Sequence, residues 1–423
     1  MHMTMAEKVL ARAAGRSSAA AGQFVTVRPD RLMVHEAFAA CNWILKSAGV
    51  KKLHDPDRVV VILDHYFPAP TASMADVHVM IRRAVEEFGI EAYLGYEGVC
   101  HQVMCESGNV MPGLLILGTD SHTTTYGALG AGGTGIGQTE MSYVMATGSL
   151  WMMVPPTIRF DLTGRPAFGV MSKDVILYIA GAYGTEAAQY RSVEFSGQAA
   201  RSMSLSERMT MCNMGVEIGA KFAFFEADEM TAAYVRERTG YSAAPFGPDE
   251  GAVYEAVHSV DVGEIPPQVA LPHNPGNVGP VVDAGNVSVD QAYLGSCTNG
   301  RIEDIAVAAR ILKGRNVHPK TRLLIAPASK DVMLAAVKLG YAEDLLTAGG
   351  HFLPAGCGAC PGSHMGLLGK GESCISSTNR NFRGRMGSED ARVYLGSPAT
   401  VAASAVTGRL TDPREFLQEK AGE

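Results

Sequence analysis

Residues 289–300 read VDQAYLGSCTNG, a strand-like run that opens directly into a turn of glycine and small polar residues. The run at 289–294 is typical of a strand in a buried sheet. The turn places a thiol, that of Cys297, at the carboxyl end of this strand, where α/β proteins build their sites. The segment is therefore the strongest chemical signal in the sequence.

Short strands and capped helices alternate along the rest of the chain. The expected strands, each rich in Val, Ile or Leu, cover residues 58–64, 114–118 and 157–162. The expected helices are 174–182 after Ser172, 331–339 after Ser329, and one that begins at Pro398 after Ser397. Such alternation favours mainly parallel sheets covered by helices.

The chain length indicates several domains. Its 423 residues are about two to four times a typical domain, so one continuous core is not expected. One boundary is predicted near Pro155 and Pro156, and another within residues 264–286, whose prolines and glycines predict an irregular linker or a loop at the edge of a site. We expect three α/β domains, at residues 1–156, 157–277 and 278–423.

The composition is typical of a soluble globular protein that binds a small molecule. Hydrophobic residues make up 47%, charged residues 19%, and the formal net charge is −7. The basic stripe of a nucleic-acid-binding protein is missing, and no apolar run approaches the roughly 20 residues that cross a bilayer. Because no secretory signal is recognisable, we expect a cytoplasmic protein without nucleic-acid or membrane partners.

Three of the eight cysteines lie in matching glycine-rich turns. Cys297 is followed sixty residues later by GCGACPG, residues 356–362, which contains Cys357 and Cys360. Glycines let the backbone approach closely and point amides at sulfur, as an iron-sulfur cluster requires. In a four-iron cluster three cysteines would leave one iron without a protein ligand, and that iron can bind substrate as a Lewis acid.

Two further interpretations of these cysteines stay open. A redox Cys-x-x-Cys pair is less favoured, because it would not need a third cysteine in a similar turn. A zinc site needs a fourth ligand, for which His351, His364 or Cys374 are candidates. The spacing favours a cluster over zinc. The five remaining cysteines are interpreted as buried apolar residues: Cys41, Cys100, Cys105, Cys212 and Cys374.

Carboxylates and imidazoles gather at or near expected strand ends. Asp120, Ser121 and His122 follow the strand that ends near Gly118, and Asp64-His65 follows residues 59–63. A third imidazole, His101, lies in VCHQ at 99–102. A single histidine is more often structural than catalytic, but three in such positions predict a site for proton transfer.

The segment SSTNRNFRGR at 376–385 concentrates positive charge in an acidic protein. It holds Arg380, Arg383 and Arg385 within six residues. Guanidinium groups bind carboxylates bidentately, so the segment is a candidate clamp for a polyacid. The alternative is an exposed basic loop.

The glycines at 130–135 match G-x-G-x-x-G, but their context is wrong for a dinucleotide site. The preceding strand ends near Gly118, too early for the fingerprint, and no acidic residue follows at the usual distance. These glycines are instead interpreted as close backbone packing beside the turn at 120–122.

Taken together, the segments resemble the aconitase superfamily, and more closely the large subunits of isopropylmalate isomerase (3-isopropylmalate dehydratase) and homoaconitase. The resemblance runs in family order over nearly the whole chain and is carried by TDSHT at 119–123, CNMGVEIGA at 212–220, GSCTN at 295–299, CGACPG at 357–362 and NRNFRGR at 379–385. It implies three α/β domains packed around a 4Fe-4S cluster whose ligands are Cys297, Cys357 and Cys360.

The resemblance also implies roles for the remaining site residues. Asp64-His65 matches the pair that protonates the leaving hydroxyl, and His101 with Glu217 matches a second proton-relay pair. The turn of Asp120, Ser121 and His122 matches the one that holds substrate and the iron-bound water. The residues matched to substrate binding are His35, Asn213, Asn379, Arg380 and Arg385, of which the two asparagines would contact the cluster region, and Arg383 has no counterpart.

Single-chain aconitases continue into a swivelling domain, which this sequence does not show after Arg385. The resemblance therefore implies a separate small subunit, in a heterodimer or heterotetramer, and a hydro-lyase or isomerase acting on a hydroxy di- or tricarboxylic acid, as in leucine biosynthesis. Isopropylmalate, homoaconitate, methylmalate-type and dimethylmalate-type acids all remain open. A zinc enzyme and an RNA-binding apo-protein also remain open, and the acidic composition argues against RNA binding.

Overall fold

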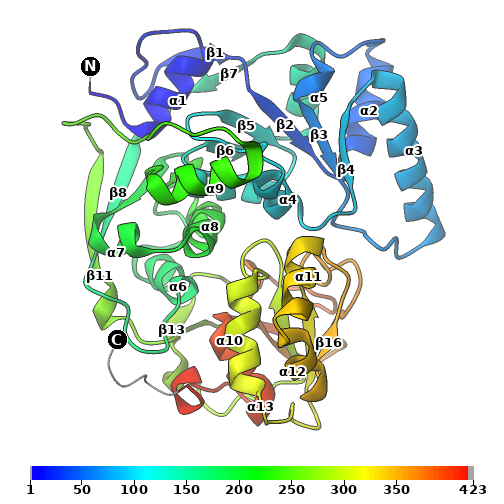
Figure 1. The fold of residues 1–423 in the computed structure, drawn as a ribbon, viewed down its shortest axis with the longest axis vertical. Helices are drawn as coiled ribbons and strands as arrows, with labels where there is room; N and C mark the ends of the chain where they lie inside the picture. Colours follow the sequence, from blue (N-terminus) through cyan, green and yellow to red (C-terminus); the bar gives the residue numbers. More distant parts are fainter. Residues whose placement is uncertain (1, 418–423) are drawn as a thin grey trace. The chain divides into compact units, whose positions relative to one another are not determined.

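The computed structural model describes residues 2–417 and separates into two compact units (Figure 1). Unit 1 consists of Met1–Asp64, Ala69–Leu162 and Ala188–Val260. Unit 2 consists of His65–Pro68, Thr163–Ala187 and Asp261–Glu423. Among the described residues, no helix is both long and apolar enough to span a membrane.

A five-stranded sheet forms the centre of unit 1. Every neighbouring pair in it is parallel. In sheet order its strands are β4 (Ala92–Gly95), β3 (Val59–Ile62), β2 (Arg31–Val34), β5 (Leu115–Gly118) and β6 (Gly132–Gly135). Both β3 and β5 are buried along their whole length, as expected of parallel strands covered on two faces.

Helices of unit 1 bury apolar faces against this sheet. Phe38 of α2 and Ile81 of α3 belong to the same buried cluster as Val59 and Val61 of β3, and Figure 1 shows both helices near this part of the sheet. The helices of unit 1 are α1 (Met5–Ala13), α2 (Phe38–Ser47), α3 (Ala72–Phe88), α4 (Cys100–Glu106), α5 (Gln138–Thr147), α7 (Gly197–Ser202), α8 (Leu205–Met214) and α9 (Glu229–Thr239).

Unit 1 contains two smaller sheets. One pairs β1 (Phe24–Val27) with β7 (Leu150–Met153) in antiparallel fashion. The other has the order β10 (Phe222–Phe224), β9 (Ser192–Ser196), β8 (Thr157–Thr163) and β11 (Ala256–Asp261), and its first three strands are parallel.

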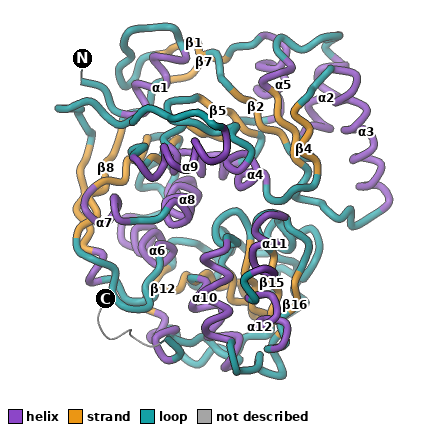
Figure 2. The backbone as a smooth tube through the Cα atoms, viewed as in Figure 1, coloured by secondary structure: helices purple, strands orange, loops and turns teal. Residues whose placement is uncertain are grey.

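Unit 2 is built on a seven-stranded sheet. Its order is β13 (Val278–Pro280), β12 (Gln268–Ala270), β18 (Arg392–Gly396), β17 (Ser373–Ser376), β14 (Gln291–Gly295), β15 (Arg322–Ala326) and β16 (His351–Phe352). The five strands from β18 to β16 are parallel, whereas β12 is antiparallel to both neighbours. Its helices, which Figure 2 distinguishes from the strands, are α6 (Ser172–Tyr183), α10 (Ile302–Leu312), α11 (Lys330–Lys338), α12 (Tyr341–Thr347) and α13 (Pro398–Thr407).

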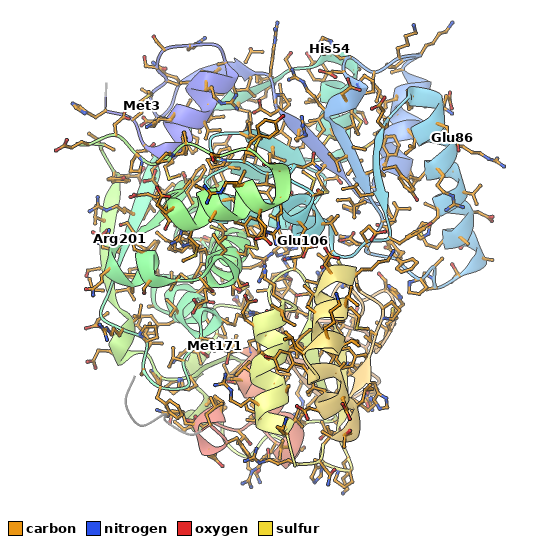
Figure 3. All side chains as sticks on the ribbon, in the orientation of Figure 1. Met3, His54, Glu86, Glu106, Met171 and Arg201 are labelled. Carbon is orange, nitrogen blue, oxygen red and sulfur yellow. The ribbon has the colours of Figure 1, made fainter. Side chains whose placement is uncertain are left out.

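The predicted α/β class with mainly parallel sheets is confirmed, and most element positions agree to within two residues. The hydroxyls of Ser329 and Ser397 accept hydrogen bonds from the first turns of α11 and α13, as predicted. Ser172 does not cap α6. It is the first helical residue, and the cap is Met171 (labelled in Figure 3), whose amide donates to the Asp174 carboxylate at 2.8 Å.

The predicted irregular linker at 264–286 is wrong, because it contains β12 and β13. The prediction assumed that prolines exclude a strand, but proline is tolerated on an edge strand. β13, which contains Pro280, is the edge strand of its sheet. The three-domain division stays a prediction. The three largest sheets follow its order along the chain, but residues 163–187 belong to unit 2.

The glycines at 130–135 pack as predicted, but they also form a strand, β6. A Cβ on Gly133 would lie 2.1 Å from the Thr123 carbonyl oxygen, and one on Gly135 would lie 2.7 Å from that of Asp120. Only glycine lets this strand approach the turn so closely.

Candidate active site

The turn after β5 presents the first group of predicted site residues. Asp120 ends the extended segment and caps a 3₁₀ helix at Ser121–Leu129, with its Oδ1 accepting from the His122 amide at 2.7 Å. The Thr123 hydroxyl donates to the Asp120 carbonyl at 2.5 Å. Backbone hydrogen bonds and the close glycine strand therefore hold Asp120 in one position.

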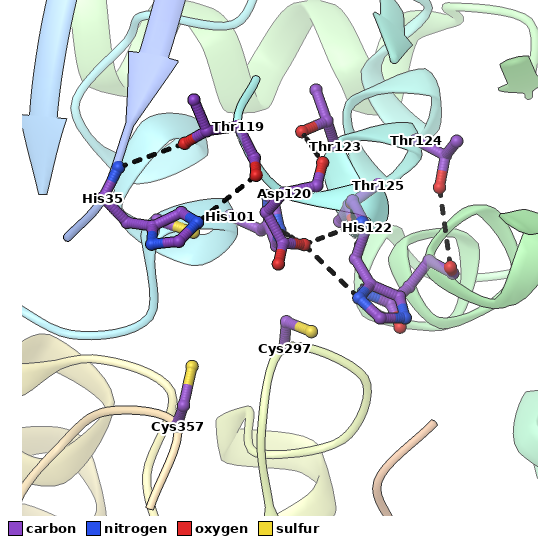
Figure 4. Close-up of polar contacts among 12 residues, drawn as sticks. His35, His101, Thr119, Asp120, His122, Thr123, Thr124, Thr125, Cys297 and Cys357 are labelled. Atoms are coloured by element: carbon purple, nitrogen blue, oxygen red, sulfur yellow. Dashed lines mark hydrogen bonds and ion pairs between the residues drawn. The ribbon is translucent and has the colours of Figure 1, made fainter. Parts of the chain in front are cut away.

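Two histidines share the Asp120 carboxylate (Figure 4). His101 Nε2 lies 2.8 Å from Asp120 Oδ1, and His122 Nδ1 lies 3.3 Å from the same oxygen. On its other side, His122 Nε2 lies 2.8 Å from Glu217 Oε1. The result is a carboxylate–imidazole chain in the order His101, Asp120, His122, Glu217.

This order corrects one pairing that the resemblance implied. His101 was expected to pair with Glu217, but its two ring nitrogens contact Asp120 and, at 3.2 Å, the hydroxyl of Tyr126. Glu217 pairs with His122 instead. The sequence order of these residues carries no information on which imidazole meets which carboxylate, since they come from α4, the turn after β5 and the 3₁₀ segment Gly215–Ile218.

Burial lowers the pKa of His101, and the hydrogen bond and negative charge of Asp120 oppose this effect. Since an ionised carboxylate only accepts hydrogen bonds, Nε2 of the neutral ring donates to Asp120 and Nδ1 accepts from Tyr126. Both nitrogens of His122 face carboxylates. The carboxylate–imidazole chain can therefore take up or release a proton with little rearrangement.

Asn213, at the end of α8, supports this turn. Its Nδ2 donates to Thr125 Oγ1 at 2.9 Å, and that hydroxyl donates to the His122 carbonyl at 2.6 Å. Asn213 is fully buried. A contact between Asn213 and a cluster stays a prediction.

A cavity of about 610 Å³ opens beside the turn, within unit 1. His35 lines it together with Asp120 and Ser121, and His35 Nε2 lies 3.3 Å from the Thr119 carbonyl. Lys221 and Tyr190 also line the cavity but were not predicted. The only sequence signal for Lys221 was its position directly after the motif at 212–220.

The Asp64-His65 pair lies at the end of β3. Asp64 is buried and its Oδ2 accepts from the Cys100 amide at 2.6 Å, which anchors the first turn of α4. His65 belongs to unit 2, where its Nδ1 lies 4.0 Å from Cys357 Sγ and its carbonyl 3.1 Å from His364 Nε2. Proton donation by this pair stays a prediction.

The three predicted cysteine ligands are buried in unit 2 on constrained turns. Cys297, Cys357 and Cys360 are 7%, 5% and 5% exposed. Ser296, directly before Cys297, has φ +80°, a conformation that non-glycine residues rarely adopt and that is typical of functional sites. Gly358 has φ +56°, and a Cβ there would lie 2.4 Å from the Tyr293 hydroxyl, which donates to the Cys357 carbonyl.

Side chains from the arginine-rich segment face these thiols. Asn379 Nδ2 lies 3.4 Å from Cys297 Sγ, and Asn379 Oδ1 lies 3.8 Å from Cys360 Sγ. Arg385 Nη2 lies 3.9 Å from Cys360 Sγ. Arg380 and Arg385 are half-buried, whereas Arg383 is exposed, which agrees with the absence of a family counterpart for Arg383.

The thiols fit an iron-sulfur cluster better than zinc. All eight cysteines lie within the described residues, and none of them forms a disulfide. Three sulfurs on one tetrahedral zinc lie roughly 3.8 Å apart, given a Zn–S distance of about 2.3 Å. Among residues 2–417, no group of three metal-binding side chains with ligand atoms within 4.8 Å of one another includes Cys297 or Cys360. A cluster spreads its thiolates over separate irons, and the amide and guanidinium N–H groups nearby suit its sulfurs.

Comparison with known proteins agrees with this arrangement. The model of the aconitase family (aconitate hydratase) matches residues 7–408, and this family normally binds a 4Fe-4S cluster. The chain is 47% identical over 419 residues to 3-isopropylmalate dehydratase large subunit 1 of Methanopyrus kandleri, covering 99% of this chain and 100% of that protein.

Two further relatives widen the comparison. The chain is 44% identical to the probable methanogen homoaconitase large subunit of Methanothermobacter thermautotrophicus, covering 98% of each chain. The crystal structure of Thermococcus kodakaraensis aconitase X shares the fold, with a TM-score of 0.50 and 11% identity over 84% of each chain. The match along almost the whole length, together with the carboxylate–imidazole chain and the buried cysteine turns, establishes that this chain belongs to the aconitase family.

Proposed function

We propose that the chain is the large subunit of a 4Fe-4S hydro-lyase that reversibly dehydrates and rehydrates a hydroxy di- or tricarboxylic acid of the 3-isopropylmalate or homoaconitate type. The observation that carries the proposal is the set of three buried thiols on turns of positive φ, two of them contacted by one asparagine amide. The high identity to named large subunits supports the same function.

Removing water from a hydroxy acid requires a base for the carbon-bound proton and an acid for the leaving hydroxyl. The chain His101–Asp120–His122–Glu217 is suited to moving protons, because each imidazole contacts a carboxylate at 2.8 Å. Ser121 and His35 line the adjoining cavity, where a substrate carboxylate or hydroxyl could be held. Asp64 and His65 are proposed to protonate the leaving hydroxyl.

Unit 2 supplies the remaining requirements. Cys297, Cys357 and Cys360 would hold the cluster and leave one iron without a protein ligand, and that iron would supply Lewis-acid polarisation of the hydroxyl. Arg380 and Arg385 would bind substrate carboxylates, which keeps the anionic substrate oriented during proton transfer.

The relatives are named large subunits, which implies a small-subunit partner for this chain. We propose that this partner carries the swivelling domain and completes the site in a heterodimer or heterotetramer. A cytoplasmic location belongs to the same proposal, because cysteines that form no disulfide are typical of a reducing compartment.

The test is anaerobic co-expression with a small subunit, followed by reconstitution with iron and sulfide. We expect broad visible absorption from a cluster, acid-labile sulfide, and reversible formation of an unsaturated acid from 2- or 3-isopropylmalate or homocitrate. Methylmalate- and dimethylmalate-type acids are assayed in parallel to define the substrate.

Two results would overturn the proposal. Zinc without acid-labile sulfide would indicate a zinc enzyme that uses the same thiols. A fully loaded cluster with no turnover of any of these acids would contradict the hydro-lyase function. A gel-shift titration with RNA at two salt concentrations tests the non-enzymatic hypothesis of an RNA-binding apo-protein, for which we expect no binding.

A further inference from the structure

A buried lysine of unit 2 has no part in the chemistry described above. Lys173, in the first turn of α6, is 0% exposed. Its Nζ donates to the carbonyl oxygens of Ser377 at 2.8 Å and Thr378 at 2.5 Å. Within residues 2–417, no carboxylate oxygen lies within 4.0 Å of this ammonium. Burying an ammonium without a direct ion pair is costly, so its position calls for a specific explanation.

The two carbonyl groups belong to the turn that leads to the cysteine sulfurs. Thr378 is directly followed by Asn379, whose amide contacts Cys297 Sγ and Cys360 Sγ. The same turn is fastened to the turn of Cys297, since the Ser377 hydroxyl accepts from the Gly295 amide at 3.0 Å and donates to the Asn299 carbonyl at 3.1 Å. Lys173 thus holds the backbone that directs Asn379 at the sulfurs.

Acidic groups surround Lys173 and act on it through their charge, without a direct ion pair in the part of the chain that the structure describes. Burial lowers the pKa of Lys173 to about 7, while the negative charges of Asp174, Asp304, Cys360 and Cys297 raise it. The two carboxyls are themselves buried, and burial raises the pKa of Asp174 to about 7 and that of Asp304 to about 6. Negative charge added at the thiols would therefore favour the protonated lysine.

We propose that Lys173 is a positioning residue for the cluster, which fixes the Ser377–Thr378 turn so that Asn379 faces the cysteine sulfurs, and whose buried positive charge raises the reduction potential of the cluster. The inference rests on the proposed function only in requiring that a cluster binds. Reduction adds negative charge to the cluster, and a nearby cation in a medium of low dielectric constant stabilises that charge.

Three substitutions separate the two effects. K173M keeps the length of the side chain but removes both the charge and the donors. K173Q removes the charge and keeps an N–H donor, whereas K173R keeps the charge and the donors. The matched control is K330M, because Lys330 also lies in the first turn of a helix of unit 2 but is exposed.

Each variant is reconstituted as the complex with the small subunit, and the iron content, the EPR spectrum and the midpoint potential of the cluster are measured. We expect K173M and K173Q to bind a cluster with a more negative midpoint potential than wild type. The EPR g values should change in K173M, and less in K173Q. K173R should return the potential toward the wild-type value, and K330M should match wild type in both measurements.

The outcomes discriminate between the inference and the function beneath it. If the wild-type complex binds no cluster, the proposed function fails as well. If wild type binds a cluster and K173M and K173Q retain its potential and g values, only the role of Lys173 is refuted. If all three variants fail to fold while K330M folds, Lys173 is a structural residue of the core and the positioning role is wrong.

Discussion

The carboxylate–imidazole chain of unit 1 and the cysteine turns of unit 2 differ in what their polar groups contact. In unit 1 the reactive atoms bind one another, at 2.8 Å between His101 and Asp120 and again between His122 and Glu217. In unit 2 the sulfurs lie 3.4 to 4.0 Å from amide, imidazole and guanidinium groups. The first group is complete in the protein alone, and the second has the geometry of a ligand shell.

This contrast predicts different responses to mutation. A preorganised proton relay loses rate when one member changes, but the fold and any bound group remain. A ligand shell loses the group itself. Replacing residues of each kind therefore separates chemistry from assembly.

The largest effect is expected for C360S. Removing one of three thiolates should abolish stable cluster binding, with loss of visible absorption and a fall in activity of about 10³-fold or more, because the Lewis acid is lost. C374A is the matched control, since Cys374 is also buried in unit 2 but lies within β17. Iron content and turnover of the reconstituted complexes are the measurements. A C360S protein with full iron content would contradict the ligand assignment.

D120N should lower the rate without removing the cluster. Asp120 contacts both imidazoles, so its replacement breaks the relay at its centre and should reduce kcat by about 10²- to 10⁴-fold. Iron and sulfide content should stay at the wild-type level because no thiol is altered. Equal losses of rate and iron would show that the two groups are not separable in this way.

Much of the unit 2 site could be predicted from sequence because its signals are local. A strand that opens into a glycine-rich turn with Cys297, and a second such turn with Cys357, are visible in short windows. Arg383 is exposed beside the half-buried Arg380, and a role of Arg380 in substrate binding stays a prediction. Ser296 was not recognised as strained, since serine in a left-handed conformation has no signature in composition.

For the unit 1 site, the sequence predicted which residues to consider but not which of them contact one another. His101 lies on α4 and Glu217 on a 3₁₀ segment after α8, so their partners depend on how distant elements pack. The same limit explains Lys221, which lines the cavity from the residue before β10. The strands β12 and β13 were missed because prolines surround them in the sequence. Proline argues against a strand only in the interior of a sheet, where the strand must donate backbone hydrogen bonds to neighbours on both sides.

Substituting two arginines of unit 2 compares the half-buried Arg380 with the exposed Arg383. R380A should lower kcat/KM by about 10- to 100-fold, because losing a charge-assisted hydrogen bond to a substrate carboxylate costs about 1.5 to 3 kcal/mol. R383A, in the same segment but exposed, should change kcat/KM by less than about twofold. Steady-state kinetics at constant cluster content provide the test. Similar losses in both variants would indicate a general effect of positive charge, without a specific clamp.

The smallest expected effect concerns His101, at one end of the carboxylate–imidazole chain of unit 1. Burial lowers the pKa of His101, so the acidic limb of the kcat/KM profile should lie below pH 6.5, the ordinary value for histidine. The Tyr126 hydroxyl lies 3.2 Å from Nδ1 and stabilises the neutral ring by donating to it. Y126F removes that donor, so the pKa of His101 and the acidic limb should rise by about half a pH unit, equivalent to about 0.7 kcal/mol.

Y254F is the matched control for this shift. The Tyr254 hydroxyl also bonds a buried group of unit 1, the Glu194 carboxylate at 2.8 Å, but no member of the relay. Its removal should leave the acidic limb in place. An unchanged limb in Y126F, or a limb displaced to lower pH, would show that Nδ1 of His101 does not accept from Tyr126. The proton would then lie on Nδ1, and Nε2 would have to face Asp120 without a proton, an arrangement that requires the carboxyl group itself to be protonated.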